Sequence, residues 1–247
     1  MNKQPISYMQ TDPRWAKNPY RVRGETSTIG GSGCGPTCAA MLITTMTGKV
    51  FTPEDACKWS LEHGYKALNQ GTYYSYFTPQ FKAYDIVCTR LNMANVYGRP
   101  AEKVHDTVLE LLRAGYYIIA CMGKGLWTKS GHYIVAWWAD GKIYINDPAS
   151  TKPERLLGDL DTFRNQVKYY WAVDAREHNK EDDEDMSYDK FKEYMQQYEA
   201  EKAKEAASAW AENGLAEAKA KGITDGTRPQ SYATRQEVAL MVNKATK

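Results

Sequence analysis

The spacing of apolar side chains changes near the middle of the chain. Residues 101–114 carry them at helical intervals, which predicts an amphipathic helix whose apolar face holds Val104, Val108, Leu111 and Leu112. The stretches that follow have the lengths and residue types of strands, with apolar runs at 116–122 and 132–138 and alternation at 142–146. A further β-rich stretch at 166–173 would complete the sheet.

The dipeptide Asp140-Gly141 separates the second and third of these strands and is a strong signal for a tight hairpin. Before the sheet region, residues 37–43 are small or apolar, as in a helix that is buried on most faces. Thr52 and Pro53 then supply an N-cap and a first-turn proline for a helix that ends near His63. Helices followed by an antiparallel sheet predict an α+β fold.

Cys34 lies in a glycine-rich loop that continues as a helix. Pro36 suits the first turn of that helix, which places Cys34 at its N-terminus, where unpaired N–H groups favour a thiolate over a thiol. The neighbouring glycines remove side chains that would block a substrate carbonyl. Most free cysteines are small buried hydrophobes, but such a residue does not need this loop. We therefore interpret Cys34 as a nucleophile.

A thiol nucleophile needs a general base, and the chain has four histidines. His63 is expected at a helix C-terminus, His105 off the apolar face of its helix and in solvent, and His178 in a charged stretch after the domain. His132 differs because it opens a strand directly after the loop 129–131. It is the candidate base, with a hydrogen-bonded core histidine as the alternative.

A third group should orient the base. Counting outward from the Asp140-Gly141 turn brings position 133 opposite position 148, so Asp147 is expected beside His132. The alternative for Asp147 is an ordinary Asp-Pro turn. Each of these alternatives is reasonable for one residue alone. To exclude a catalytic site, however, Cys34, His132 and Asp147 would all have to serve only the fold.

The composition adds few constraints. A net charge of +2 gives no argument for nucleic acid or a membrane as partner, and no apolar run is long enough to cross a bilayer. Five irregularly spaced cysteines do not indicate a disulfide framework, and Cys34 with Cys38 lacks the second Cys/His pair of a zinc site. The N-terminus has no apolar signal-peptide region, so synthesis in the cytoplasm is expected.

These residues resemble the C39-like branch of the papain-like cysteine peptidases over about residues 5–175. The motifs that carry the resemblance are Tyr8-x-Gln10, Gly33-Cys34-Gly35-Pro36-Thr37, Gly131-His132-Tyr133-Ile134-Val135 and Asn146-Asp147-Pro148-Ala149. The resemblance implies a papain-like fold, with a nucleophile helix packed on an antiparallel sheet. It also implies a nucleophile (Cys34), a general base and acid (His132), an orienting carboxylate (Asp147) and an oxyanion-hole amide (Gln10). This chemistry needs no metal and no cofactor.

The remainder of the chain is different in character. Residues 181–185 are all acidic, which is typical of a solvated linker. A helix is expected from Ser187, with one apolar stripe formed by Tyr188, Phe191, Met195 and Tyr198. This stripe would either dock on the catalytic domain or pair with a second chain as a homo-oligomer.

The C-terminal segment reads as a helix, a Gly/Asp turn and a second helix capped by Thr234 and Glu237. It resembles an S-layer-homology-like repeat, as at the end of cell-wall hydrolases of phages that infect Gram-positive bacteria. That resemblance implies a wall-polymer contact at Arg235, whereas the alternative is that the motif only caps a helix. The predicted organisation is a peptidase domain at 1–178, a linker and helix at 179–206, and a small helical module at 207–247.

Together these features predict a cysteine endopeptidase that hydrolyses amide bonds of Gram-positive peptidoglycan peptides, like a phage endolysin that a separate holin releases to the wall. The expected partners are that peptide and a secondary wall polymer, and neither nucleic acid nor a membrane. One alternative is a C39-like peptidase for protein leader peptides, which ranks lower because no transporter segments accompany it. The other is a catalytically silent wall-binding protein.

Overall fold

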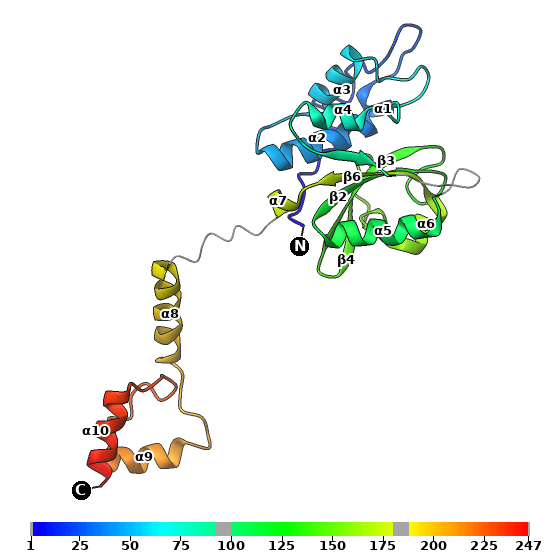
Figure 1. Ribbon diagram of the computed structural model, residues 1–247. Helices are drawn as coiled ribbons and strands as arrows, with labels where there is room; N and C mark the ends of the chain where they lie inside the picture. Colours follow the sequence, from blue (N-terminus) through cyan, green and yellow to red (C-terminus); the bar gives the residue numbers. More distant parts are fainter. Residues whose placement is uncertain (1, 92–99, 180–187, 247) are drawn as a thin grey trace. The chain divides into compact units, whose positions relative to one another are not determined.

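The computed structural model describes residues 2–91, 100–179 and 188–246 (Figure 1). The chain divides into two compact units, Met1–Glu181 and Asp182–Lys247. They are described separately below.

The N-terminal unit contains a six-stranded sheet with the order β1-β6-β2-β3-β4-β5, in which every neighbouring pair is antiparallel. Its strands are β1 (Cys88–Arg90), β2 (Tyr116–Met122), β3 (His132–Ala139), β4 (Lys142–Asn146), β5 (Leu157–Gly158) and β6 (Val167–Asp174). The predicted bounds of β2 and β4 are confirmed, and those of β3 and β6 are confirmed to within one residue.

Helices cover both faces of this sheet (Figure 1). They are α1 (Ile29–Ser32), α2 (Cys34–Thr47), α3 (Pro53–Glu62), α4 (Phe77–Lys82), α5 (Glu102–Arg113), α6 (Leu160–Gln166) and α7 (Arg176–Asn179), together with the 3-10 turn η1 (Pro153–Arg155). The mixture of helices with an antiparallel sheet confirms the α+β prediction. The first helices lie on one side of the sheet, and α5 and α6 lie on the other.

The sheet is buried on both faces, which explains why its central strands are almost entirely apolar. Along β2, Ile119 and Cys121 pack in the core formed by α2, α3 and α4. Their neighbours Ile118 and Ala120 pack with α5 and Phe163 in a second core. Successive side chains of a strand point to opposite faces, so both sets must be apolar. Helix α2, which begins at Cys34, thus lies directly on the sheet.

The hairpin between β3 and β4 has the predicted turn. Asp140 and Gly141 both have positive φ values, 50° and 74°, as a type I′ turn requires. The register runs from Ala139 opposite Lys142 to Val135 opposite Asn146. This register confirms the count that places the beginning of β3 beside the end of β4.

One histidine differs from its prediction. His105 is buried, and its Nδ1 lies 2.9 Å from the hydroxyl oxygen of Tyr170. The expectation of a solvated side chain was wrong because it used only the apolar stripe of the helix. The long Tyr170 side chain of β6 reaches the flank of α5 and gives the imidazole a buried partner.

The N-terminal segment crosses the sheet and ends beside the β4 terminus. The backbone N–H of Asn2 donates to Trp138 O at 2.9 Å, and the Asn146 side chain donates to Pro5 O at 3.1 Å. The N–H of Gln10 then donates to Pro148 O at 2.8 Å. Residue 10 is thereby fixed next to the turn that follows β4.

The C-terminal unit consists of α8 (Tyr188–Lys202), α9 (Glu212–Ala220) and α10 (Arg235–Ala245). Thr234 caps α10 and forms the predicted capping box with Glu237. The predicted acidic linker at 181–185 and the N-cap at Ser187 lie outside the described residues. Within the described ranges, no helix combines the length and apolar character that crossing a membrane requires.

Candidate active site

Cys34 is the first residue of α2 and is half-buried. The chain reaches it from α1 through Gly33, where a Cβ atom would lie 2.6 Å from the carbonyl oxygen of Ile29. The next turn is equally tight, because a Cβ at Gly35 would meet Thr72 Oγ1 at 3.1 Å and the Tyr133 ring at 3.3 Å. These glycines allow the helix to begin close against its neighbours. This packing role adds to the one expected from the sequence, which is to leave room for a substrate carbonyl.

His132 and Asp147 come together as predicted from the hairpin. His132 opens β3, Asp147 directly follows β4, and His132 Nε2 lies 2.7 Å from Asp147 Oδ1. The same Oδ1 accepts the backbone N–H of Ala149 at 2.8 Å. Since Nε2 faces the carboxylate, Nδ1 is the nitrogen left for Cys34, and a side-chain hydrogen bond joins His132 to Cys34. The imidazole therefore bridges a thiol and a buried carboxylate.

The electrostatics of this cluster favour an ion pair. Burial alone would lower the pKa of His132, but its hydrogen bonds to Asp147 and Cys34 outweigh burial and raise the pKa to about 9. Burial would likewise raise the pKa of Cys34. The hydrogen bond and charge of His132, with backbone N–H bonds from Tyr133 and Gly35, lower that pKa below its ordinary value. Both shifts favour the thiolate–imidazolium form of the pair over the neutral thiol and imidazole.

Gln10 is buried beside α1, and its Nε2 donates to Gly30 O at 2.8 Å. Its Oε1 is buried and has no hydrogen-bond partner among the described residues. One hydrogen of the Nε2 amide is used by Gly30, which leaves a second for another acceptor. Gly30 and Gly31, predicted to lie in a loop, belong to the short helix α1, so Gln10 lies between α1 and the Pro148 turn after Asp147.

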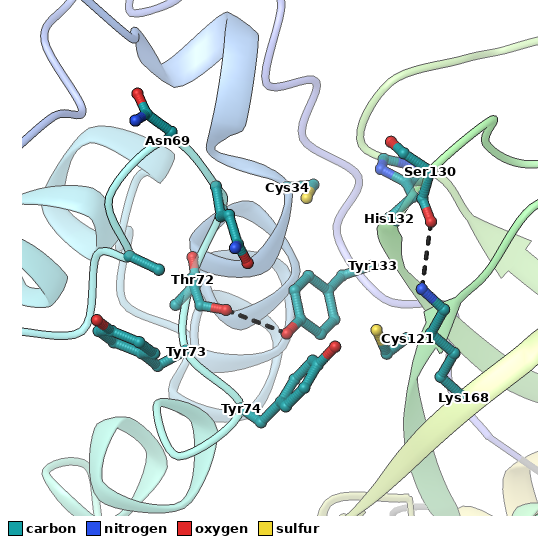
Figure 2. A pocket seen from close by; sticks show the side chains of 14 residues that line it. Cys34, Asn69, Thr72, Tyr73, Tyr74, Cys121, Ser130, His132, Tyr133 and Lys168 are labelled. Carbon is teal, nitrogen blue, oxygen red and sulfur yellow. Dashed lines mark hydrogen bonds between the residues drawn. The ribbon is translucent and has the colours of Figure 1, made fainter. Parts of the chain in front are cut away.

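Cys34 and His132 open into a pocket of about 430 Å³ (Figure 2). Figure 2 shows Cys34 at its centre, the segment from Asn69 to Tyr74 on one side, and Ser130, His132 and Lys168 on the other. Tyr73 and Tyr74 are exposed at the wall. The pocket that Cys34 lines is thus bordered by exposed tyrosine side chains.

The model of the peptidase C39-like family matches residues 10–179, more than two thirds of the chain. The chain belongs to this family. The match confirms the prediction of a C39-like cysteine peptidase domain. A comparison with curated proteins gives no match.

In this C39-like domain, the loop before His132 is fixed by Gln166 at the end of α6. The backbone N–H of Gly123 donates to Gln166 O, and the N–H of Leu126 donates to Gln166 Oε1, each at 2.6 Å. At Gly125 a Cβ would lie 1.9 Å from that Oε1, so a larger residue there would displace the Gln166 side chain. These contacts fix the conformation of the loop that precedes His132.

The opposite wall of the C39-like pocket is held by a buried ion pair. Lys66 Nζ lies 2.9 Å from Glu25 Oε1 and donates to Ala67 O and Gln70 O at 2.7 and 2.6 Å. The Glu25 carboxylate also accepts the N–H of Asn69, which has a positive φ of 55°. This network fixes the segment that faces Cys34, and sequence reasoning did not find it.

Arg155 is a second neighbour of the site that the sequence analysis did not find. Its Nη2 lies 2.5 Å from Asp147 Oδ2, on the carboxylate oxygen that His132 does not use. Asp147 thus has a cationic partner on each side. Arg155 follows Asp147 by only eight residues, but it belongs to no motif that would have identified it.

Arg235, the predicted wall-polymer contact, is the first residue of α10 and is exposed. Near it, Arg228 Nη2 pairs with Glu237 Oε1 at 3.2 Å.

The five cysteines are free thiols, and the described residues contain no group of three or more metal-ligating side chains.

Proposed function

We propose that this C39-like domain is an endopeptidase acting on peptides of the Gram-positive cell wall, through Cys34 as nucleophile, His132 as general base and acid, and Asp147 as its orienting group. The observation that supports this mechanism is the imidazole held between Asp147 at 2.7 Å and the Cys34 thiol, at the mouth of a pocket.

The reaction begins with the Cys34 thiolate attacking an amide carbonyl, whose oxygen becomes an oxyanion. The backbone N–H of Cys34 and the second Nε2 hydrogen of Gln10 stabilise this oxyanion. His132 then gives its proton to the leaving amine, and the C–N bond breaks to leave a thioester. Water, deprotonated by His132, attacks the thioester and releases the carboxylic acid and Cys34.

The chemistry of the pocket supports a wall-peptide substrate. Lys168 lines it, with Nζ 3.3 Å from Ser130 O, and pairs with no carboxylate among the described residues. An ammonium in the same pocket as Cys34 favours substrates with a free carboxylate. Stem peptides of peptidoglycan carry such groups on their acidic residues.

Lys168→Gln is expected to lower kcat/KM about 10-fold for a peptide with a carboxylate beside the cleaved bond, because one charged contact is lost. The rate for the same peptide with that carboxylate amidated should change little. Steady-state kinetics on the two peptides measures the difference. Lys142→Gln removes an exposed lysine outside the pocket and serves as the matched control. Equal losses on both peptides would contradict a role for Lys168 in recognising charge.

The C-terminal unit supports action at the wall, where the protein would work after release from the cytoplasm. Arg235 would contact an anionic wall polymer, and the exposed apolar side chains of α8 would pair two copies of the chain. These side chains are Tyr188, Phe191, Tyr194, Met195 and Tyr198.

Arg235→Ala is expected to lower the fraction of protein that pellets with purified sacculi by about 5- to 10-fold, since one anion contact of a small module is removed. Lys204→Ala removes an exposed positive charge elsewhere in the same unit and should pellet as the wild type does. Equal losses for the two variants would indicate only non-specific attraction between charges.

The test of the function is to incubate the full-length protein with purified Gram-positive sacculi, and to follow turbidity, new amino groups and fragment masses. Release of new amines with defined peptide fragments supports the proposal and identifies the bond. Release of sugar reducing ends without amines would overturn it. If the sacculi stay intact while unrelated peptides are cleaved, the substrate is a protein and not a wall peptide.

A further inference from the structure

The carboxylate of Asp147 is an ion-pair partner of both His132 and Arg155. Its side chain is fully buried, whereas 18% of the Arg155 side-chain surface is exposed. Oδ1 lies 2.7 Å from His132 Nε2, and Oδ2 lies 2.5 Å from Arg155 Nη2. The carboxylate cannot rotate without breaking one of these contacts.

Arg155 is also tied to the loop that leads to His132. The same Nη2 donates to Trp127 O at 2.7 Å, and Trp127 Nε1 donates back to Arg155 O at 2.9 Å. Trp127 is buried, and its ring centre lies 5.9 Å from that of Phe163 in α6. Arg155 thus links the turn after β4 to the loop before β3, the two segments that carry Asp147 and His132.

We propose that Arg155 is a positioning residue that fixes the Asp147 carboxylate toward His132 and, by its charge, sets the pH range in which the Cys34–His132 pair is active. The inference rests on the proposed roles of these three residues. It adds Arg155, from η1, to the residues that serve the site.

The physical argument is electrostatic. Breaking a buried pair by removing one partner leaves the other charge uncompensated, so Asp147 would lose its fixed orientation. A positive charge also lowers the proton affinity of every titratable group near it. The groups that face this cluster are Cys34 on α2, His132 on β3 and Asp147 after β4, and Lys168 on β6 lines the same pocket. Loss of the guanidinium charge should raise the pKa values of Cys34 and His132.

Two variants separate charge from hydrogen bonding. Arg155→Gln keeps a donor but has no charge, and Arg155→Lys keeps the charge but loses the planar guanidinium that serves Asp147 and Trp127 together. The rate of Cys34 alkylation by iodoacetamide, measured from pH 4 to 10, reports thiolate formation without any substrate. The pH profile of kcat/KM on a cleaved peptide gives the second measurement.

Arg155→Gln is expected to move the alkylation midpoint and both limbs of the kcat/KM profile to higher pH, by roughly half a unit. It should also lower kcat/KM at the optimum about 10- to 100-fold, the cost of a misplaced catalytic group. Arg155→Lys should lower the optimum rate but leave the limbs in place. Arg176→Met breaks a more exposed Arg–Asp pair away from the pocket, in which Arg176 Nη2 lies 2.7 Å from Asp174 Oδ2, and should change neither the limbs nor the rate.

If Arg155→Gln lowers kcat/KM but leaves both limbs of the pH profile in place, Arg155 has only a structural role. If the variant keeps the wild-type kcat/KM, Arg155 does not position Asp147. Thermal unfolding of both variants identifies losses due to instability. Alkylation needs no substrate, so a shift of its midpoint supports the inference even if wall peptides are not cleaved. Failure of the inference can therefore be distinguished from failure of the proposed substrate.

Discussion

Replacing Cys34 with alanine is expected to reduce amide-bond hydrolysis by roughly 10⁴-fold or more, to the level that binding and oxyanion contacts alone provide. Cys34 is the half-buried thiol at the start of α2, hydrogen-bonded to His132 and with its pKa below the ordinary thiol value. Without the sulfur atom no thioester can form. Release of new amino groups from a cleaved peptide measures the loss.

Cys38 offers a matched control for this substitution. It lies one helical turn further along α2, is fully buried, and burial raises its pKa well above the ordinary value. Cys38→Ala is therefore expected to retain hydrolysis, with a circular dichroism spectrum like that of the wild type. Hydrolysis that survives in Cys34→Ala, or that is lost equally in Cys38→Ala, would contradict Cys34 as the nucleophile.

The sequence was sufficient where local chemistry and register decide the structure. Asp140-Gly141 specifies a type I′ turn, and that turn alone fixes which residues of β3 and β4 are opposite each other. The position of Asp147 beside His132 follows from this count. Cys34 at the start of a helix follows from Pro36 and the glycine-rich loop in the same way.

The supporting residues could not be predicted because their partners are remote or their geometry is not periodic. The Lys66–Glu25 pair joins residues 41 positions apart, and neither lies in a motif. Arg155 comes from a short 3-10 turn, and its position depends on how Trp127 packs against the sheet. His105 was misassigned because a helical stripe does not reveal a tyrosine on the strand below it.

The pH dependence of the site follows from the directions of its two pKa shifts. The pKa of Cys34 is lowered and that of His132 is raised to about 9, so the thiolate–imidazolium pair is populated between the two values. Activity should be lost on the acid side as the thiolate takes up a proton. It should be lost on the alkaline side near pH 9, where His132 has no proton left for the leaving amine.

Replacing His132 with alanine tests this assignment. Hydrolysis is expected to fall roughly 10⁴-fold, because the general base and acid is removed. The alkylation midpoint of Cys34 should also move upward, since the contact that lowers its pKa is lost and burial, which raises it, remains. His63→Ala is the matched control, as that exposed imidazole bonds to Trp59 O in its own helix region and stacks on the Trp59 ring. An unmoved alkylation midpoint in His132→Ala would mean that the helix N-terminus, and not the imidazole, keeps Cys34 ionised.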